Sequence, residues 1–208
     1  HDGGLAGYTT YEDAGIGTLD NGNLTLMSYD PTSSIWRYGW ASTPLPLDIT
    51  AAQTIYGANR TTNAGDSTHI LLEDGLLRSI YDVSGIDTLD ASYIDHGITL
   101  KLGSGKSTNI GELSTVYIAL STVIEKAIGT YSNDLIFGEK GANTIQGLGG
   151  NDEIQGLGGN DILIGGSGAD TIYGQNGNDE LQGGTGEDEL QGGAGEDVLF
   201  GQAGIDKL

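Results

Sequence analysis

The feature that most limits how this chain can fold is a nine-residue repeat that fills residues 129–208. In one frame from Gly129, the nine blocks read GTYSNDLIF, GEKGANTIQ, GLGGNDEIQ, GLGGNDILI, GGSGADTIY, GQNGNDELQ, GGTGEDELQ, GGAGEDVLF and the shorter GQAGIDKL. Every block opens with glycine, and the eighth position is always Ile or Leu. The fourth position is glycine in all blocks but the first, where Ser132 stands. Such a regular period indicates stacked coils, because each repeat can bury its apolar side only against its neighbours.

The repeat predicts a parallel β-roll. Six residues rich in glycine can turn tightly, and the next three are expected to form a short strand whose aliphatic side chain points inward. Two blocks then complete one coil, and stacked coils build two parallel sheets around a narrow Ile/Leu core. That core is too thin to offset the entropy that so many glycines lose on folding. A further source of stabilisation is therefore required.

The sixth position supplies a candidate, because it carries a carboxylate in eight of the nine blocks. These carboxylates and the turn carbonyls should converge between neighbouring coils, and a cage of hard oxygens suits calcium better than magnesium, which gives up its waters reluctantly. The expected side-chain ligands are Asp134, Asn143, Asp152, Asp161, Asp170, Asp179, Asp188, Asp197 and Asp206, with weaker sites at Asn143. The expected carbonyl ligands belong to Gly147, Gly149, Gly156, Gly158, Gly165, Gly168, Gly174, Gly183, Gly186, Gly192 and Gly195.

The charge balance agrees with a cationic partner. The chain holds 29 acids and 8 bases, a net charge of -21, which disfavours nucleic acid or an anionic membrane as a partner. Residues 129–208 hold 14 acids and 2 bases, which about six divalent ions would neutralise. If each ion is shared by a block and the next but one, nine blocks allow seven ions. We predict that this region is disordered without calcium and folds on binding it.

Other readings of the composition are weaker. One or two acidic, glycine-rich blocks would equally be a flexible linker, but nine blocks in phase favour a folded roll. The chain has no cysteine, so a thiolate metal site and a disulfide framework are both excluded. No apolar run reaches the roughly 20 residues that span a bilayer, so no membrane span is expected.

The repeat resembles the nonapeptide GGxGxDxUx of the RTX calcium-binding β-rolls. Asn143 departs from this pattern at the acidic position. Other residues replace the second glycine in six blocks, namely Thr130, Glu139, Leu148, Leu157, Gln175 and Gln202.

Residues 1–128 have a mixed composition and a different organisation. Residues 45–56 predict a helix, with Asp48 as its N-cap and Gly57 as its stop. Alternating runs in residues 67–102 predict short strands, and residues 117–120 and 123–127 predict two more. The expected fold class is mainly β: a parallel β-roll with flanking strands, preceded by a small mixed helical and loop segment.

Four segments resemble successive parts of serralysin-type zinc metalloproteases: LTLMSYD (24–30), STPLPLDITAAQTIYGANRTTNAGDS (42–67), YDVSGIDTLD (81–90) and VIEKAIGTYSNDLIFG (123–138). In that family a Met-turn of the form SxMSY lies beneath a zinc ion bound by HExxHxxGxxH. The resemblance implies that Met27 lies beneath the zinc site and that Tyr29 approaches the metal and stabilises the transition state. It also implies that His1 is the third zinc histidine, the alternative being a residue left by cloning or processing.

The resemblance further implies calcium sites before the roll, with ligands from Asn63, Gly65, Ser67, Asp82, Ser84, Asp87 and Glu125. For Asp82 and Asp87, turn capping is the alternative interpretation. The 208 residues contain no HExxH motif, and His69 and His96 lack a histidine partner four residues away. We therefore expect the chain alone to be inactive and to bind zinc only within the complete parent protein.

The hypothesis from sequence is the C-terminal portion of a secreted, serralysin-like zinc metalloendopeptidase that folds on calcium after type I export. We expect residues 1–60 to be a remnant of the catalytic domain, residues 61–128 a strand lead-in with calcium sites, and residues 129–208 the roll. Calcium ions and a missing N-terminal catalytic part are the expected partners. The alternatives are a non-enzymatic calcium-binding or adhesion module, and an RTX hydrolase or epimerase of another class.

Overall fold

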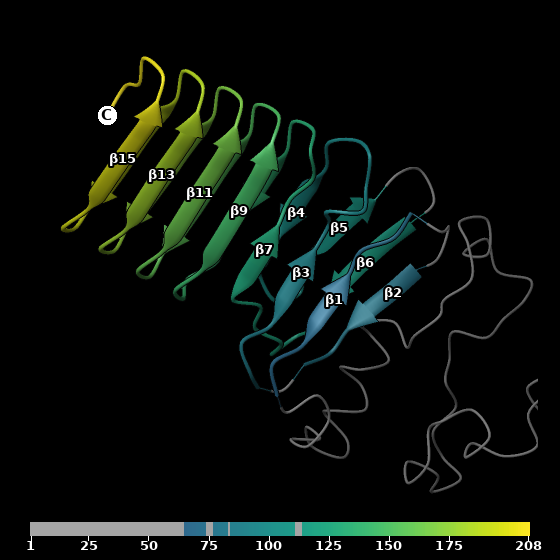
Figure 1. Ribbon diagram of the computed structural model, residues 1–208. Helices are drawn as coiled ribbons and strands as arrows, with labels where there is room; N and C mark the ends of the chain where they lie inside the picture. Colours follow the sequence, from purple (N-terminus) through teal and green to yellow (C-terminus); the bar gives the residue numbers. More distant parts are fainter. Residues whose placement is uncertain (1–64, 74–76, 83, 111–113) are drawn as a thin grey trace, which may run out of the picture. The chain divides into compact units, whose positions relative to one another are not determined.

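The computed structural model describes residues 65–73, 77–82, 84–110 and 114–208, and every regular element within these residues is a β-strand (Figure 1). The predicted helix over residues 45–56, the Met-turn and the catalytic remnant lie outside the described residues. Within the described residues, no helix has the length and apolar character needed to cross a bilayer.

Two parallel sheets form the body of the fold. The larger has seven strands in the order β1-β3-β7-β9-β11-β13-β15. They span Thr68–Ile70, Thr88–Asp90, Lys126–Ile128, Thr144–Gly149, Ile162–Ser167, Glu180–Thr185 and Val198–Ala203. The smaller has five strands in the order β14-β12-β10-β8-β4. They span Glu189–Ala194, Thr171–Asn176, Glu153–Gly158, Leu135–Phe137 and Thr99–Lys101.

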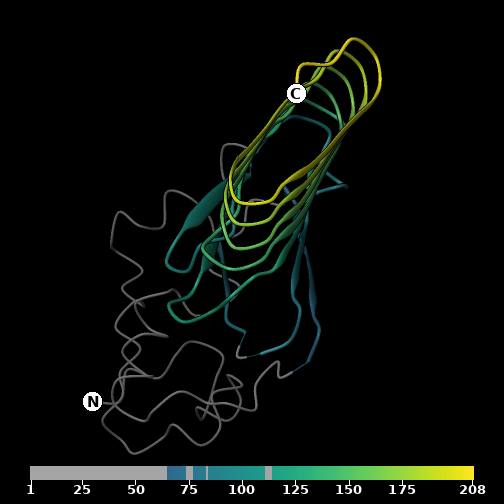
Figure 2. The same cartoon turned by 90° about the vertical axis from the view of Figure 1, so that its left-hand side faces the viewer.

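The chain alternates between these two sheets from β7 (Lys126–Ile128) onward, so that two nonads make one coil. Equivalent residues of adjacent coils are paired, as Ile154 is with Ile172 and Leu163 with Leu181. Figure 2 looks along the stack and shows successive coils as superposed flattened loops. The predicted parallel β-roll is therefore confirmed.

The eighth-position aliphatic residues form the core between the two sheets. Their side chains are buried from the first block through the seventh, and Leu199 of the eighth packs against them while partly buried. The same core continues upstream through Leu89, Leu100 and Ala127, which precede the repeat. The buried members within the repeat are Ile136, Ile145, Ile154, Leu163, Ile172, Leu181 and Leu190.

The strands of the roll are longer than the three residues expected from the sequence. From β9 onward each has six residues, because the first three positions of the next nonad continue the strand. Pairing skips the first-position glycine and resumes beyond it, as at Leu157 with Gln175. The second position has a left-handed backbone in these nonads, with φ 75° at Leu157, and this bends the strand without ending it.

Three strands outside the two main sheets form a small sheet in the order β2-β6-β5. Strand β2 (Leu77–Ile80) runs parallel to β6 (Ser114–Ile118), and β5 (Ser107–Ile110) runs antiparallel to it. The strands predicted over residues 117–120 and 123–127 are each displaced, since β6 ends at Ile118 and β7 starts at Lys126. A turn intervenes, in which Ser121 has a left-handed φ of 68° and the Thr122 N–H donates to the Ala119 carbonyl.

Candidate metal-binding edges of the roll

Both main sheets carry a row of mainly polar side chains at the edge where their strands begin. Because the strands are parallel and in register, the residue just before each strand lies directly beside its counterparts in the sheet. In the five-stranded sheet these residues are Ile98, Asp134, Asp152, Asp170 and Asp188. In the seven-stranded sheet they are Ser67, Asp87, Glu125, Asn143, Asp161, Asp179 and Asp197.

One oxygen of each sixth-position Asp is held by the backbone of the previous coil. The Asp134 N–H donates to Asp152 Oδ1 at 2.8 Å, and the Asp152 N–H donates to Asp170 Oδ1 at 2.8 Å. On the other edge the Asn143 N–H donates to Asp161 Oδ1 at 2.8 Å. The ladder continues to the last coil, with Asp206 Oδ1 accepting from the Asp188 N–H at 3.1 Å.

The second oxygen of the carboxylate is different. In five of these residues Oδ2 is buried and has no hydrogen-bond partner: Asp152, Asp161, Asp170, Asp179 and Asp188. An ionised oxygen buried without a donor or a cation destabilises the fold by several kcal/mol, on the order of the desolvation penalty of a charged group. These five oxygens, three on the edge of the five-stranded sheet and two on the edge of the seven-stranded sheet, therefore indicate a positively charged partner.

A carbonyl oxygen from the next coil approaches four of these carboxylates, those of Asp152, Asp161, Asp170 and Asp179. A methyl group on Gly147 would clash with Asp152 Oδ2 and would also lie 2.6 Å from the Gly165 carbonyl oxygen. The same holds at Gly165, where Asp170 Oδ2 and the Gly183 carbonyl meet. Glycine is required at the first position because two oxygens occupy the space that a Cβ would fill. Two oxygens facing each other without a hydrogen between them favour a cation.

The predicted glycine carbonyls divide into two groups. Those at the first position adjoin a sixth-position side-chain oxygen of the coil before. These are Gly147, Gly156, Gly165, Gly174, Gly183 and Gly192. The others lie elsewhere in the turn: Gly149 and Gly158 are strand residues at the third position, and Gly168, Gly186 and Gly195 are fourth-position residues with a positive φ.

Burial also changes the acidity of these carboxyls. It raises the pKa of Asp152 to about 7 and the pKa values of Asp161 and Asp170 to about 6. The hydrogen bond from the previous coil lowers each pKa, but less than burial raises it, and the next carboxylate along the edge raises it further. Burial raises the pKa of Asp179 in the same way. The residues fit a hard divalent cation, since carboxylate and carbonyl oxygens are the ligands that calcium prefers.

Asp134 and Asn143, in the first two nonads, do not follow this pattern. Asp134 Oδ2 accepts a hydrogen bond of 2.6 Å from the Thr130 N–H, and its Oδ1 accepts from Ile98 N–H at 2.9 Å and Thr130 Oγ1 at 3.0 Å. Asn143 Oδ1 accepts from the Glu139 N–H at 2.7 Å. Sequence reasoning had placed both residues among the ladder ligands, with weaker sites at Asn143 and no distinction for Asp134.

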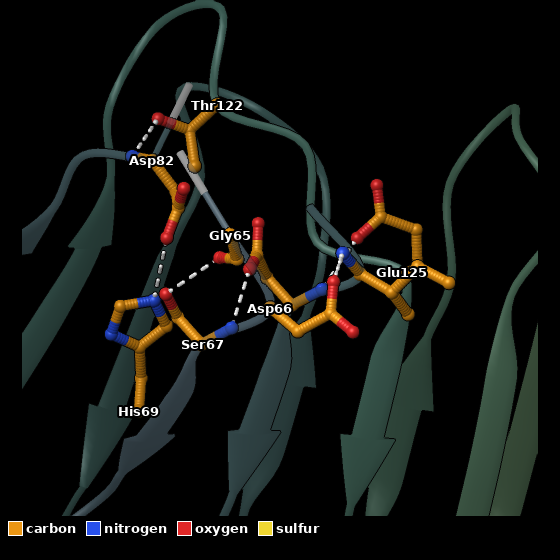
Figure 3. Close-up of polar contacts among 9 residues, drawn as sticks. Gly65, Asp66, Ser67, His69, Asp82, Thr122 and Glu125 are labelled. Carbon is orange, nitrogen blue, oxygen red and sulfur yellow. Dashed lines mark hydrogen bonds and ion pairs between the residues drawn. The ribbon is translucent and has the colours of Figure 1, made fainter. Parts of the chain in front are cut away.

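A second polar cluster lies at the start of β1 and β3 (Figure 3). The Ser67 N–H donates to Asp87 Oδ1 at 2.9 Å, and the Asp87 N–H donates to Glu125 Oε2 at 2.8 Å. This continues the ladder of the roll into the preceding coils. Ser67 Oγ also donates to the Gly65 carbonyl at 3.1 Å, and burial raises the pKa of Asp87.

Asp82 of this cluster is buried, and neither of its carboxylate oxygens has a hydrogen-bond partner. Its backbone N–H donates to Thr122 Oγ1 at 3.2 Å, and its Oδ2 lies 3.4 Å from Nε2 of His69 (Figure 3). Sequence reasoning missed His69 and also Asp66, whose Oδ1 accepts from the Ile86 N–H at 2.9 Å. Ser84 is exposed.

The residues expected at a zinc site, His1 and Tyr29, lie outside the described residues, as does Asn63. The described part contains one further group of potential ligands, formed by Glu73, Asp95 and His96. His96 Nε2 lies 3.1 Å from Glu73 Oε2. Both side chains are substantially exposed, so this contact is accounted for as a surface ion pair.

The fold defines the C-terminal part of the chain as a parallel β-roll with a row of carboxylates along each of its two turn edges. Its sequence matches the family described as the RTX calcium-binding nonapeptide repeat over residues 128–163, 146–181 and 173–208. Residues 128–208 are therefore RTX calcium-binding repeats.

Over about two-thirds of its length, the chain is also homologous to serralysin and AprA metallopeptidases. It is 36% identical to metallopeptidase AprA of Pseudomonas marginalis in an alignment of 161 positions that covers 67% of this chain and 34% of that protein. It is 34% identical to a serralysin of Proteus mirabilis over 61% of this chain and 29% of that protein. For serralysin C of Dickeya chrysanthemi the identity is 33%, over 62% of this chain and 30% of that protein. The chain thus spans about a third of the length of these relatives.

Proposed function

We propose that calcium ions are held along both turn edges of the roll, between each nonad and the next but one. Calcium supplies the positive charge that the buried, donor-free Oδ2 atoms lack. Those five oxygens are the observation that carries the proposal. The residues that would hold the ions are Asp152, Asp161, Asp170, Asp179, Asp188, Asp197 and Asp206, together with first-position glycine carbonyls.

Folding of the roll would depend on this binding. Asp carboxylates on one edge are stacked coil upon coil, so the metal-free fold concentrates like charges in a buried row. Burial of the narrow aliphatic core contributes too little free energy to offset that repulsion and the conformational entropy that the glycines lose on folding. Because the binding sites exist only in the folded chain, the free energy of calcium binding contributes directly to the free energy of folding.

The cluster before the roll would form a separate calcium site. Its support is the buried Asp82, whose two oxygens lack donors, and the ladder that joins Ser67, Asp87 and Glu125. The resemblance to serralysin-type proteases adds further backbone and side-chain oxygens of neighbouring residues to the ligand set. The whole proposed set is Asn63, Gly65, Ser67, Asp82, Ser84, Asp87 and Glu125.

At the level of the whole protein, we propose that the chain is the C-terminal portion of a zinc metalloendopeptidase. Residues 1–60 would be the end of the catalytic domain, residues 61–128 the lead-in and residues 129–208 the roll. His1 would be a zinc ligand, and Tyr29 would approach the metal and stabilise the oxyanion. The homology to serralysins supports this reading. Without HExxH, the 208 residues by themselves would not hydrolyse peptides.

The proposed location is extracellular, reached by type I secretion. Low calcium inside the cell would leave the roll extended, and the higher calcium outside would fold it. The test is a circular dichroism titration of the chain with calcium, followed by excess EGTA, with the bound calcium measured by elemental analysis. We expect a β-sheet spectrum only with calcium, and a spectrum unchanged by EGTA would overturn the proposal.

The second candidate is a non-enzymatic calcium-binding or adhesion module, favoured by the missing HExxH motif. The gene sequence immediately upstream of the codon for residue 1 separates the two candidates. A segment encoding HExxHxxGxx supports the protease, and peptide hydrolysis by the full-length product, lost on removal of zinc, is its functional readout.

A further inference from the structure

Asn143 occupies the ladder position that an aspartate holds in every other nonad, and its amide group contacts a different set of partners. Its Oδ1 accepts from the Glu139 N–H at 2.7 Å. Its Nδ2 donates to the carbonyl oxygens of Ile124 and Glu125, at 3.4 and 3.5 Å. Asn143 is buried.

The orientation of this amide is fixed by its surroundings. A backbone N–H can only donate, so the atom facing Glu139 must be the oxygen, and two carbonyls can only accept, so the atom facing them must be the nitrogen. An aspartate at the same place would turn an unpaired oxygen toward those two carbonyls. The hydrogens of the amide nitrogen therefore supply the positive charge that a cation would supply at other turns.

The first nonad has the same property on the other edge. The Thr130 N–H donates to Asp134 Oδ2, the oxygen that corresponds to the donor-free Oδ2 of Asp152. Thr130 and Glu139 are also the second-position residues without a positive φ, whereas the second position has φ 81° at Leu148 in the third nonad. An N–H directed at the sixth-position side chain thus accompanies the ordinary backbone conformation, and a free Oδ2 accompanies the left-handed one.

We infer that residues 129–146 form a metal-free seam, in which protein hydrogen bonds stand in for calcium, and that the calcium ladder starts at the third nonad. The seam separates the cluster around Asp87 and Glu125 from the ladder that starts at Asp152 and Asp161. This inference rests on the proposed function and names where along the roll it applies.

The test is the number of calcium ions bound per chain in the Asn143→Asp variant. The new oxygen would face the Ile124 and Glu125 carbonyls, so we expect one more ion than in the wild type. Asp161→Asn, the same exchange reversed at the next position of the ladder, should bind one ion fewer. Both counts are made by elemental analysis after gel filtration in calcium.

Three results separate the possibilities. If the wild-type chain binds no calcium, the proposed function itself is overturned. A calcium-loaded wild type with an unchanged count in Asn143→Asp and a reduced count in Asp161→Asn overturns the seam alone. If Asn143→Asp does not fold, a crystal structure of the wild type grown in calcium decides the question: the seam is supported when no ion contacts Asn143 or Asp134, and overturned when one does.

Discussion

The backbone N–H of Asp152 donates a hydrogen bond of 2.8 Å to Oδ1 of Asp170 in the next coil, while Asp170 Oδ2 remains buried without a donor. One carboxylate thus joins two coils through one oxygen and leaves the other for a cation. Asp152 and Asp188 on the same edge repeat the relationship, since Oδ1 of each accepts from the previous coil and Oδ2 is buried without a donor, so the sheet hydrogen bonds and the proposed ions reinforce the same coil-to-coil contacts.

Replacing one ladder carboxylate should weaken calcium binding more than replacing a neighbouring surface carboxylate. In Asp188→Asn the donor-free oxygen loses its charge, and we expect one ion fewer and about tenfold weaker binding at the adjoining site, or about 1.4 kcal/mol. Glu187→Gln removes the same charge from the exposed residue beside it and should leave both values close to wild type. Isothermal titration with calcium measures the difference, and equal effects of the two changes would argue against the ligand assignment.

A methyl group at the first position of a nonad should be poorly tolerated. In Gly165→Ala the new Cβ would clash with Asp170 Oδ2 and lie 2.7 Å from the Gly183 carbonyl, so we expect a loss of about 1–3 kcal/mol in stability with calcium present. Gly141→Ala is the control, because its Cβ would meet only the flexible end of Glu139, at 3.2 Å. Thermal melts in calcium compare the two, and similar melting temperatures would contradict the crowded geometry.

Calcium binding should depend on pH. Burial raises the pKa values of Asp161 and Asp170 to about 6 and that of Asp152 to about 7, above the ordinary value of 3.8. Between about pH 4 and pH 7 the metal-free fold therefore binds more protons than the unfolded chain, so its stability falls as pH rises. Calcium competes with those protons.

We expect weaker calcium binding at pH 5.5 than at pH 7.5, with protons released on binding near pH 6.5, and more β-structure in EGTA at pH 4.5 than at pH 7.5. Titrations in two buffers of different ionisation enthalpy measure the proton release. A calcium affinity that does not change between the two pH values would show that the buried carboxylates do not bind the ion.

The left-handed second position offers a stabilising change. Gln202 is exposed and has a φ of 69°, which costs a non-glycine residue about 1 kcal/mol, so Gln202→Gly should raise the stability by roughly 0.5–1 kcal/mol. Gln182→Gly removes the same hydrogen bond, which Gln202 Nε2 donates to Gln182 Oε1. Residue 182 has an ordinary strand conformation, so this change relieves no strain and should destabilise the roll. Denaturant unfolding in calcium distinguishes the two, and a loss of stability in both would refute the strain argument.

The period of the repeat was sufficient to predict the coil, the core residues and the glycine turns, because each depends on side-chain size within one block. The length of the strands was not predictable, since Leu157 and Gln175 pair in a left-handed conformation that their residue types disfavour. The sequence did contain an overlooked signal upstream of the repeat. Asp87-Thr88-Leu89 repeats the Asp-Thr-aliphatic pattern of Asp170-Thr171-Ile172, and both segments lie at the start of a strand.

The candidate site was predictable in residue type but only partly in role. Carboxylates at a fixed spacing indicated a row of ligands, and the amide of Asn143 indicated a weaker site, yet the spacing could not distinguish Asp134 from the other aspartates. The difference at both residues depends on whether the N–H of Thr130 or Glu139 points at the side chain, which is a property of backbone orientation. The residues around His1 and Tyr29 stay predictions from the family resemblance.

The pairing of Ile154 with Ile172, and of every other core residue with its equivalent in the next coil, has a consequence for assembly. A slip of one whole coil would return each aliphatic side chain to the core and each aspartate to a backbone amide. The repeated interior of the roll therefore does not by itself determine which coil pairs with which. Ala127 of β7 pairs with Ile145 beside Asn143, and both Ala127 and Asn143 differ in residue type from their equivalents in the other described coils of this sheet. This junction fixes the starting point from which all later coils take their alignment.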